Sequence, residues 1–192
     1  MNESRSTEEV ISFLRSLRAV RRYASSPVSD AVIQDILEVG RWTGSAKNTQ
    51  PWEFLVVRDR EVLRELSTLG QFADHLAGAA FAIALIMASP SNAFDAGRLA
   101  EHVMLAGWAH GVGSCIASIF PEGNETRAKA LLGVPAERGM RTSIAFGYPA
   151  DQGALRIQTS PERRSVLPSI GRKRLSEIAF LDRYGQPWRL VE

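Results

Sequence analysis

The sequence predicts an α+β fold with four or five strands. Three observations support this fold class. Several stretches carry apolar residues three and four positions apart, which is typical of helices with one buried face. Residues 81–87 are apolar throughout, which is typical of a strand covered on both faces of a sheet. The strand-like segments do not alternate strictly with helices, as they would in a parallel α/β sheet.

In the first half of the chain, residues 8–17 have helical apolar spacing and end before a serine- and proline-containing break. Ser29 then offers a side-chain oxygen as the N-cap of a second helix. A polar loop follows, and residues 53–58 are expected to form a strand. Asp59 is expected to cap a third helix, which Gly70 stops.

The second half begins with the apolar strand over residues 81–87. After it we expect a loop over 90–93, a helix over 95–110, a strand over 116–120, a helix capped by Asn124 and closed by Gly133, a strand over 142–148 and a short helix over 175–181. The long helix is rich in alanine and glycine, so another helix could approach it closely. The tryptophans at 42, 52 and 108 are expected to pack in the core.

Length and composition fit one domain, or a domain with an arm. The 192 residues are 45% hydrophobic and 23% charged, as in an ordinary globular protein. The N-terminus is polar and no apolar signal segment follows it, and the longest apolar run, 77–88, is too short to span a membrane. The single Cys115 cannot form an intrachain disulfide, which favours a reducing cytoplasm.

Several kinds of site are excluded by spacing. Gly111 and Gly113 resemble the start of a dinucleotide fingerprint, but its third glycine would fall at Ile116 and the glycines follow a predicted helix. No P-loop is present, and the three histidines have no metal-ligand spacing. The neighbours of Cys115 give no sign of an activated thiolate, so a buried structural cysteine is expected.

Arginines cluster near both ends of the chain, around 15–22 and 163–174, although the net charge is only +2. Three interpretations are open: a nucleic-acid surface, a small anionic site such as one phosphate, and a solvated charged face. Because the net charge is small and no nucleic-acid-binding motif accompanies the arginines, we rank nucleic acid last.

A polar loop over residues 45–52 is the most informative segment. Asn48 and Gln50 each offer donors and an acceptor, and Pro51 sets its own φ and removes a donor where the loop ends. A rigidly anchored polar loop of this kind is suited to holding a flat heterocyclic ligand. The alternative for Asn48 and Gln50 is a turn that satisfies its own backbone.

The loop Ser45-Ala46-Lys47-Asn48-Thr49-Gln50-Pro51-Trp52 resembles the S-x-x-N-x-Q-P-W signature of the nitroreductase family of FMN-dependent oxidoreductases. Residues 17–23 resemble its R-R-S-[IV]-R-x-[FY] opening, with Leu17 and Ala19 in place of the usual arginine and serine. Four more segments resemble family motifs: 111–120 (G-L-G-S-C-W-I-G-x-F), 131–135 (L-L-G-x-P), 146–149 (L-G-Y-P) and 171–178 (R-K-P-L-E-E-I). The resemblance extends from Leu14 to Trp188.

This resemblance implies a nitroreductase-like fold, a mainly antiparallel four- to five-stranded sheet wrapped by helices, in an intertwined homodimer that holds two FMN at its interface. Residues 1–192 would form a single FMN-binding domain. A C-terminal arm over about 152–192 would extend over the partner subunit and could add a strand there. The 95–110 helix would be the main dimer contact.

The resemblance also implies site residues. Arg18, beside Ala19, would bind the FMN phosphate, and Arg21 would stand near flavin N1 and the C2 carbonyl, where a guanidinium favours the reduced anionic flavin. Backbone groups of Ala117, Ser118 and Ile119 would face flavin N5. The basic residues Arg172, Lys173 and Arg174 would complete the phosphate cradle, and which of the three touches phosphate is left open.

The loop residues Ser45, Asn48 and Gln50 would touch the ribityl chain and the dimethylbenzene ring, often from the partner subunit. Lys47 would reach the cofactor, the substrate or solvent. Gln71 is either a flavin or substrate contact or part of a surface turn.

The implied reaction is ping-pong: NAD(P)H, either NADH or NADPH, reduces FMN by hydride transfer, and an electron-poor acceptor such as a nitroaromatic or quinone is then reduced. This would be a cytoplasmic flavoprotein, with no nucleic-acid or membrane partner. Three alternatives are open: a family branch with other chemistry (flavin cleavage, dehalogenation or natural-product dehydrogenation), a non-catalytic flavin-binding or redox-sensing protein, and a nucleic-acid binder.

Overall fold

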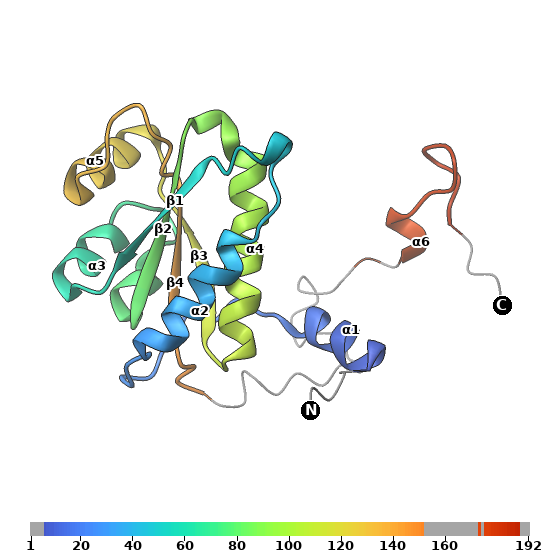
Figure 1. The fold of residues 1–192 in the computed structure, drawn as a ribbon, viewed down its shortest axis with the longest axis horizontal. Coiled ribbons are helices and arrows are strands. Elements are labelled where there is room, and N and C mark those ends of the chain that lie inside the picture. The colour runs from blue at the N-terminus through green and yellow to red at the C-terminus, as the bar shows by residue number, and fades with distance from the viewer. Residues whose placement is uncertain (1–5, 152–172, 174, 189–192) are drawn as a thin grey trace. The chain divides into compact units, whose positions relative to one another are not determined.

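The computed structural model describes residues 6–151, 173 and 175–188 (Figure 1). Contacts divide the chain into two compact units, Met1–Ile157 and Gln158–Glu192. The first unit contains the sheet and the helices that cover it. The described part of the second contains the short helix α6 (Leu175–Ile178), and Phe180 and Pro187 form an isolated bridge after it. The predicted helix at 175–181 is confirmed at its start and is shorter than expected.

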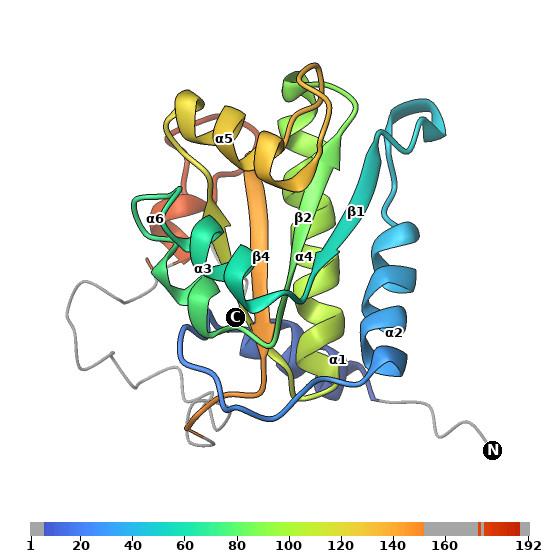
Figure 2. The same ribbon diagram turned by 90° about the vertical axis from the view of Figure 1, so that its left-hand side faces the viewer.

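The sheet has four antiparallel strands: β1 (Trp52–Val57), β2 (Phe81–Met87), β3 (Gly113–Ser118) and β4 (Thr142–Gly147). Their order across the sheet is β1-β2-β4-β3, so β1 and β3 are its two edges (Figure 2). A parallel bridge between Ala19 and Ser114 lies on the outer side of β3. The predicted α+β class with a mainly antiparallel sheet is confirmed.

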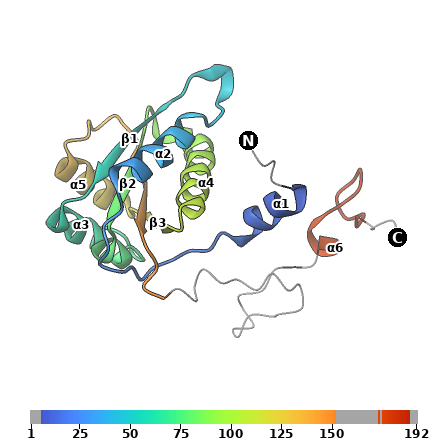
Figure 3. The same cartoon turned by 60° about the horizontal axis from the view of Figure 1, so that its bottom comes forward.

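The two faces of the sheet are covered by different helices. On β2, Phe81, Ile83 and Leu85 pack towards α2 (Asp30–Arg41) and α4 (Ala93–Ala109), while the intervening residues pack towards α3 (Arg60–Ser67) and α5 (Glu122–Leu132). Figure 3 shows these helix pairs on opposite sides of the sheet. Because successive side chains point to opposite faces, a strand covered on both faces is apolar throughout, as β2 is.

Side-chain caps determine where the first helices begin. Ser29 Oγ accepts a hydrogen bond from the Val32 N–H at 3.4 Å. Asp59 Oδ1 accepts from the backbone of Glu61 and Val62 at 2.8 and 3.0 Å. These bonds satisfy donors that have no partner inside the helix, and both predicted caps are confirmed. Helix α1 (Thr7–Ser16) begins after a capping box made by Ser6.

Three boundaries differ from the prediction. The expected loop at 90–93 is a 3₁₀ helix, η3 (Pro90–Asn92), that leads into α4. Asn124 is not a cap: it lies inside α5, and its side-chain Nδ2 donates to the Phe120 carbonyl at 3.3 Å. Strand β3 begins at Gly113, three residues before the predicted start, because residues 113–115 pair with β4.

The prediction that Trp42, Trp52 and Trp108 pack in the core is wrong for Trp42. Its side chain is 73% exposed at the end of α2, where its Nε1 donates to Glu38 at 3.0 Å. Trp108 is buried, and Trp52 packs against the core. Among the described helices, none has the length and hydrophobicity needed to cross a membrane.

Candidate functional site

A short arginine-bearing segment, residues 18–22, lies along the outer edge of β3. The Val20 N–H donates to the Ser114 carbonyl at 2.8 Å, beside the Ala19–Ser114 bridge. Gly113 permits this approach, since a Cβ there would lie 2.7 Å from Val20. The sheet therefore holds the backbone of the segment, and the side chains of Arg18 and Arg21 remain exposed.

The arginines of this segment surround a small cavity of about 180 Å³, which Asp151 also lines. Arg18 Nη1 donates to the carbonyls of Arg15 and Leu17 at 2.8 and 2.7 Å, which are among the last carbonyls of α1 and its cap. Arg18 is therefore fixed at a helix C-terminus, where positive charge is favoured. Arg18, Ala19 and Arg21 all line this cavity, and their binding of FMN stays a prediction.

His75 and Cys115 are buried groups whose pKa values respond to the charge of Arg21. Burial lowers the pKa of His75, whose Nε2 lies 3.4 Å from the Cys115 carbonyl, and the charge of Arg21 lowers that pKa further. Burial raises the pKa of the Cys115 thiol, and Arg21 partly opposes this shift. The prediction that Cys115 is buried is confirmed, and burial favours its protonated thiol over the reactive thiolate.

The segment Ala117–Ile119 presents one outward amide. The Ile119 N–H donates to the Arg141 carbonyl at 2.8 Å, towards β4. In an antiparallel pair the bonded positions alternate, and Ser118 faces Thr142 in the register, so the Ser118 N–H points to the outer edge. Ser118 is exposed, whereas the side chains of Ala117 and Ile119 are buried. Of the three predicted backbone positions, only Ser118 can offer an N–H to a ligand at this edge.

The turn after α3 lies against the same edge. The Phe120 N–H donates to the Leu69 carbonyl at 3.3 Å, and a Cβ on Gly70 would lie 2.4 Å from the Ser118 oxygen. Glycine is therefore required for the turn to approach β3 this closely. Gln71 follows it and is exposed. The sequence predicted Gly70 only as a helix stop, because a close approach between distant segments leaves no local signal.

The loop that carries Ser45, Lys47, Asn48 and Gln50 lies before β1. Three of its residues have left-handed backbone conformations, with φ of 53° at Lys47, 54° at Asn48 and 46° at Gln50. Ser45 Oγ accepts from the Gln50 N–H at 2.9 Å, so the loop closes on itself. At its base, Thr43 Oγ1 and His102 Nδ1 are 2.9 Å apart, which ties the loop to α4.

Within one chain, this loop and the arginine segment lie on opposite edges of the sheet. Two strands separate β1 from β3, which places these edges about 14 Å apart. The structure therefore does not bring Asn48 and Gln50 to Arg21 and Ser118 in a single copy. Arg172 and Arg174 lie outside the described residues, and Lys173 is exposed in the second unit.

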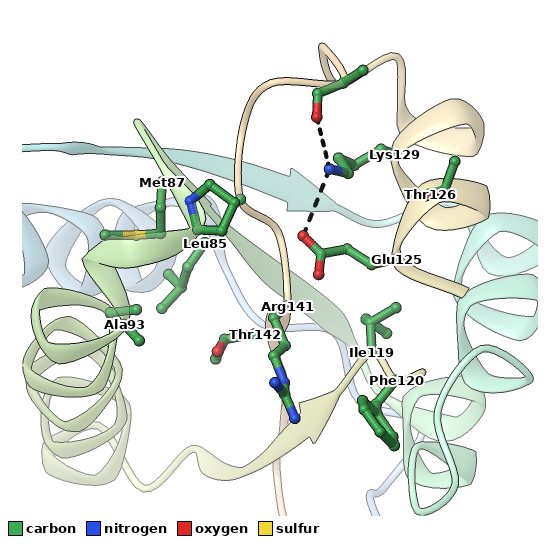
Figure 4. A pocket seen from close by; sticks show the side chains of 14 residues that line it. Leu85, Met87, Ala93, Ile119, Phe120, Glu125, Thr126, Lys129, Arg141 and Thr142 are labelled. Carbon is green, nitrogen blue, oxygen red and sulfur yellow. Dashed lines mark hydrogen bonds and ion pairs between the residues drawn. The ribbon is translucent and has the colours of Figure 1, made fainter. Parts of the chain in front are cut away.

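A larger cavity of about 530 Å³ opens beside the end of β3 (Figure 4). Its lining includes Ile119 and Phe120, the first turn of α4, the end of β2, α5 and Arg141. The Arg141 guanidinium lies 5.0 Å from the centre of the Phe120 ring. No local pattern in the sequence predicted this cavity, because its lining comes from segments far apart in the chain. Within the described part of the chain, no cluster of three or more histidine, cysteine or acidic side chains could hold a metal ion.

Comparison with known proteins gives consistent results. A profile of the nitroreductase family matches residues 14–84 and 72–148. A protein from Archaeoglobus fulgidus, provisionally named NADH dehydrogenase/NAD(P)H nitroreductase, is 32% identical over 154 residues, which cover 76% of this chain and 88% of that protein.

Solved structures share the fold. An FMN-dependent nitroreductase from Clostridium difficile R20291 superposes with a TM-score of 0.68 at 27% identity, covering 74% of this chain and 88% of the other. A protein from Bacteroides thetaiotaomicron VPI-5482 superposes with a TM-score of 0.71 at 24% identity, covering 77% and 90% of the two chains.

Proposed function

Because this chain belongs to the nitroreductase family, we propose that it is an FMN-dependent oxidoreductase that takes hydride from NAD(P)H and passes it to an electron-poor acceptor. The names of its relatives, which include FMN-dependent and NAD(P)H nitroreductases, agree with this enzyme class. Nitroaromatics and quinones are the proposed acceptor types.

The observation that carries the proposal is the outer edge of β3. The arginine segment is hydrogen-bonded there at Ser114, and the Ser118 N–H points outward on the same strand. Cations beside β3 and an outward amide on β3 form a donor set along one edge that fits an anionic, planar cofactor. The turn at Gly70 lies close to Ser118 and therefore borders the same edge of β3.

FMN, when bound, supplies the hydride chemistry, and the chain supplies binding and electrostatics. Arg18 would bind the phosphate, and the family resemblance implies Arg172, Lys173 and Arg174 as further phosphate ligands. Arg21 would stabilise the negative charge that the flavin gains on reduction. Ser118 would donate its outward backbone N–H to the flavin ring, while the side chains of Ala117 and Ile119 are buried beside it. Gln71 would contact the ring or the substrate from the adjacent turn.

We propose that the site is completed by a second copy of the chain. The polar loop lies at the β1 edge of the sheet, away from Arg21 at the β3 edge. Its residues Ser45, Lys47, Asn48 and Gln50 would therefore reach the flavin bound by the other subunit. Large apolar side chains support a homodimer: Phe94 of α4 is 78% exposed and Leu14 of α1 is 48% exposed. The chain would be one FMN-binding domain whose arm over about 152–192 extends over the partner.

A cytoplasmic location is part of the same proposal. It rests on the single Cys115, which is buried and has no cysteine partner in the chain.

The visible spectrum of the purified protein tests the function. We expect bound FMN that bleaches on addition of NADPH or NADH and recovers when a nitroaromatic or a quinone is added. A colourless protein that takes up no added FMN would refute the proposal. Bleaching without turnover on any acceptor would instead indicate a non-catalytic flavin protein.

A further inference from the structure

The larger cavity is lined on one side by the exposed residue Arg141, and the charge of its guanidinium indicates what kind of ligand the cavity could bind. Building on the proposed function, we propose that this cavity holds the aromatic ring of the electron acceptor and that Arg141 selects acceptors that carry a carboxylate on that ring.

The cavity adjoins the edge at which the proposed reaction takes place. Ile119 lines it, and the Ile119 N–H is donated to the Arg141 carbonyl at 2.8 Å. Ser118, whose outward amide is the proposed flavin contact, is the next residue along the strand. The cavity and the outward Ser118 amide therefore lie at the same end of β3.

The floor of the cavity is apolar. Leu85 and Met87 come from the end of β2, and Ala93 and Ala96 from the first turns of α4 (Figure 4). A volume of about 530 Å³ is in the range of sites that bind small organic molecules. The two alanines leave room between Leu85 and Met87 and the helix, and the resulting apolar surface suits a flat ring.

The other charged groups of the cavity compensate one another. The Lys129 side chain is 13% exposed, and its Nζ donates to the carbonyls of Ala136 and Arg138 at 3.0 and 2.9 Å and lies 3.7 Å from Glu125 Oε1. Glu125 Oε1 also accepts from the Met140 N–H at 2.8 Å. This pair is satisfied by the protein itself and leaves no charge for a ligand.

Arg141 differs from that pair. Among the residues that the structure describes, it forms no ion pair, and its guanidinium lies over the Phe120 ring at 5.0 Å. Stacking on an aromatic face orients the planar guanidinium while its N–H groups stay available for a carboxylate. An apolar floor with one oriented cation at its rim is complementary to an aromatic acid.

The test compares 4-nitrobenzoate with uncharged 4-nitrobenzamide as acceptors in the FMN-loaded enzyme. Replacing Arg141 by glutamine (Arg141→Gln) should lower the nitrobenzoate-to-nitrobenzamide ratio of kcat/KM about tenfold, the size of one lost charged hydrogen bond, mainly through KM for nitrobenzoate. The change between variants is the measured quantity, so the different intrinsic reactivity of the two compounds cancels. Arg141→Lys should retain part of the ratio.

Arg138→Gln is the matched control. It removes an arginine from the same loop, but that guanidinium pairs with Glu53 at 3.3 Å and does not line the cavity. The ratio should be unchanged in this variant. A binding measurement without NADPH, by equilibrium dialysis of 4-nitrobenzoate against FMN-loaded protein, should show a Kd about tenfold higher for Arg141→Gln than for the unmodified chain.

Two results would overturn the assignment. If Arg141→Gln and Arg138→Gln give the same ratio and the same Kd as the unmodified protein, Arg141 does not select the acceptor. If Arg141→Gln instead raises KM for NADPH and not for NADH, the guanidinium binds the 2′-phosphate of the donor. An enzyme that reduces neither compound and no quinone contradicts the proposed function, and the dialysis result still decides the role of Arg141.

Discussion

The arginine segment, residues 18–22, and the polar loop, Ser45–Gln50, are held in different ways. The arginine segment is bound by its backbone to β3, and the chain just after it is bound to Tyr148, where the Ala24 N–H donates at 2.7 Å. The polar loop makes hydrogen bonds mainly within itself, such as Gln50 N–H to Ser45 Oγ. The conformation of the arginine segment therefore depends on the sheet, whereas the conformation of the polar loop depends mainly on hydrogen bonds within the loop.

The polar loop also stores backbone strain. A left-handed conformation costs a non-glycine residue about 1 kcal/mol, and Lys47, Asn48 and Gln50 all adopt it. Such strain concentrates where a ligand or partner uses the geometry. This difference agrees with the proposal that each region supplies half of a site, the arginine segment within its own chain and the polar loop to a second copy.

The largest expected effect comes from changing the arginine segment in one subunit of the dimer and the polar loop in the other. Arg21→Ala and Gln50→Ala homodimers should each lose most reductase activity. A mixed dimer that carries one change in each chain has one intact site of two, so about half of the unmodified activity should return. Differently tagged chains, purified as mixed dimers and assayed with NADPH and a quinone, provide the measurement. Activity no higher than that of the two parents would place both halves in the same chain.

A smaller effect is expected from disturbing the sheet-bound half. Gly113→Ala puts a Cβ 2.7 Å from Val20 and should cost about 1–3 kcal/mol of unfolding free energy while weakening FMN binding. Gly123→Ala, in α5 with no atom within 4 Å of the added carbon, is the control and should be neutral or slightly stabilising. Urea unfolding and FMN titration measure the two effects, and equal behaviour of the variants would contradict a close-packed segment.

The smallest expected effect is relief of strain in the polar loop. Lys47→Gly should raise the unfolding free energy of the FMN-free protein by up to about 1 kcal/mol, because glycine adopts a left-handed φ without penalty. Thr49→Gly is the control: its φ is −70°, so glycine there gains nothing and loses chain entropy. Thermal unfolding of both variants decides the question, and destabilisation by Lys47→Gly would mean that the loop is not strained.

Local signals in the sequence were sufficient for much of the fold. Ser29 and Asp59 begin helices because a side-chain oxygen satisfies backbone donors a few residues away. The apolar run of β2 predicts a two-sided strand, because each face of that strand meets a helix layer. The family and the fold class are confirmed for the same reason: their motifs are contiguous segments of the chain.

Features that depend on distant segments were missed or placed wrongly. Asn124 has the chemistry of a cap, but the chain already turns into α5 before it. Trp42 was expected in the core, yet it lies beyond the end of the buried face of α2 and binds Glu38. The three backbone positions at 117–119 are equivalent in the sequence, and pairing with β4 decides that only the Ser118 amide points outward.

By itself, the sequence determined the order of helices and strands, the family, and the residue types of the candidate site, since these depend on short-range periodicity and local motifs. Only the tertiary structure decided that the two polar halves lie at opposite sheet edges and that Arg141 stands over Phe120 at the mouth of a cavity. Strand order and side-chain contacts join residues far apart in the chain. Their energies come from packing across the whole fold and are not encoded in any single segment.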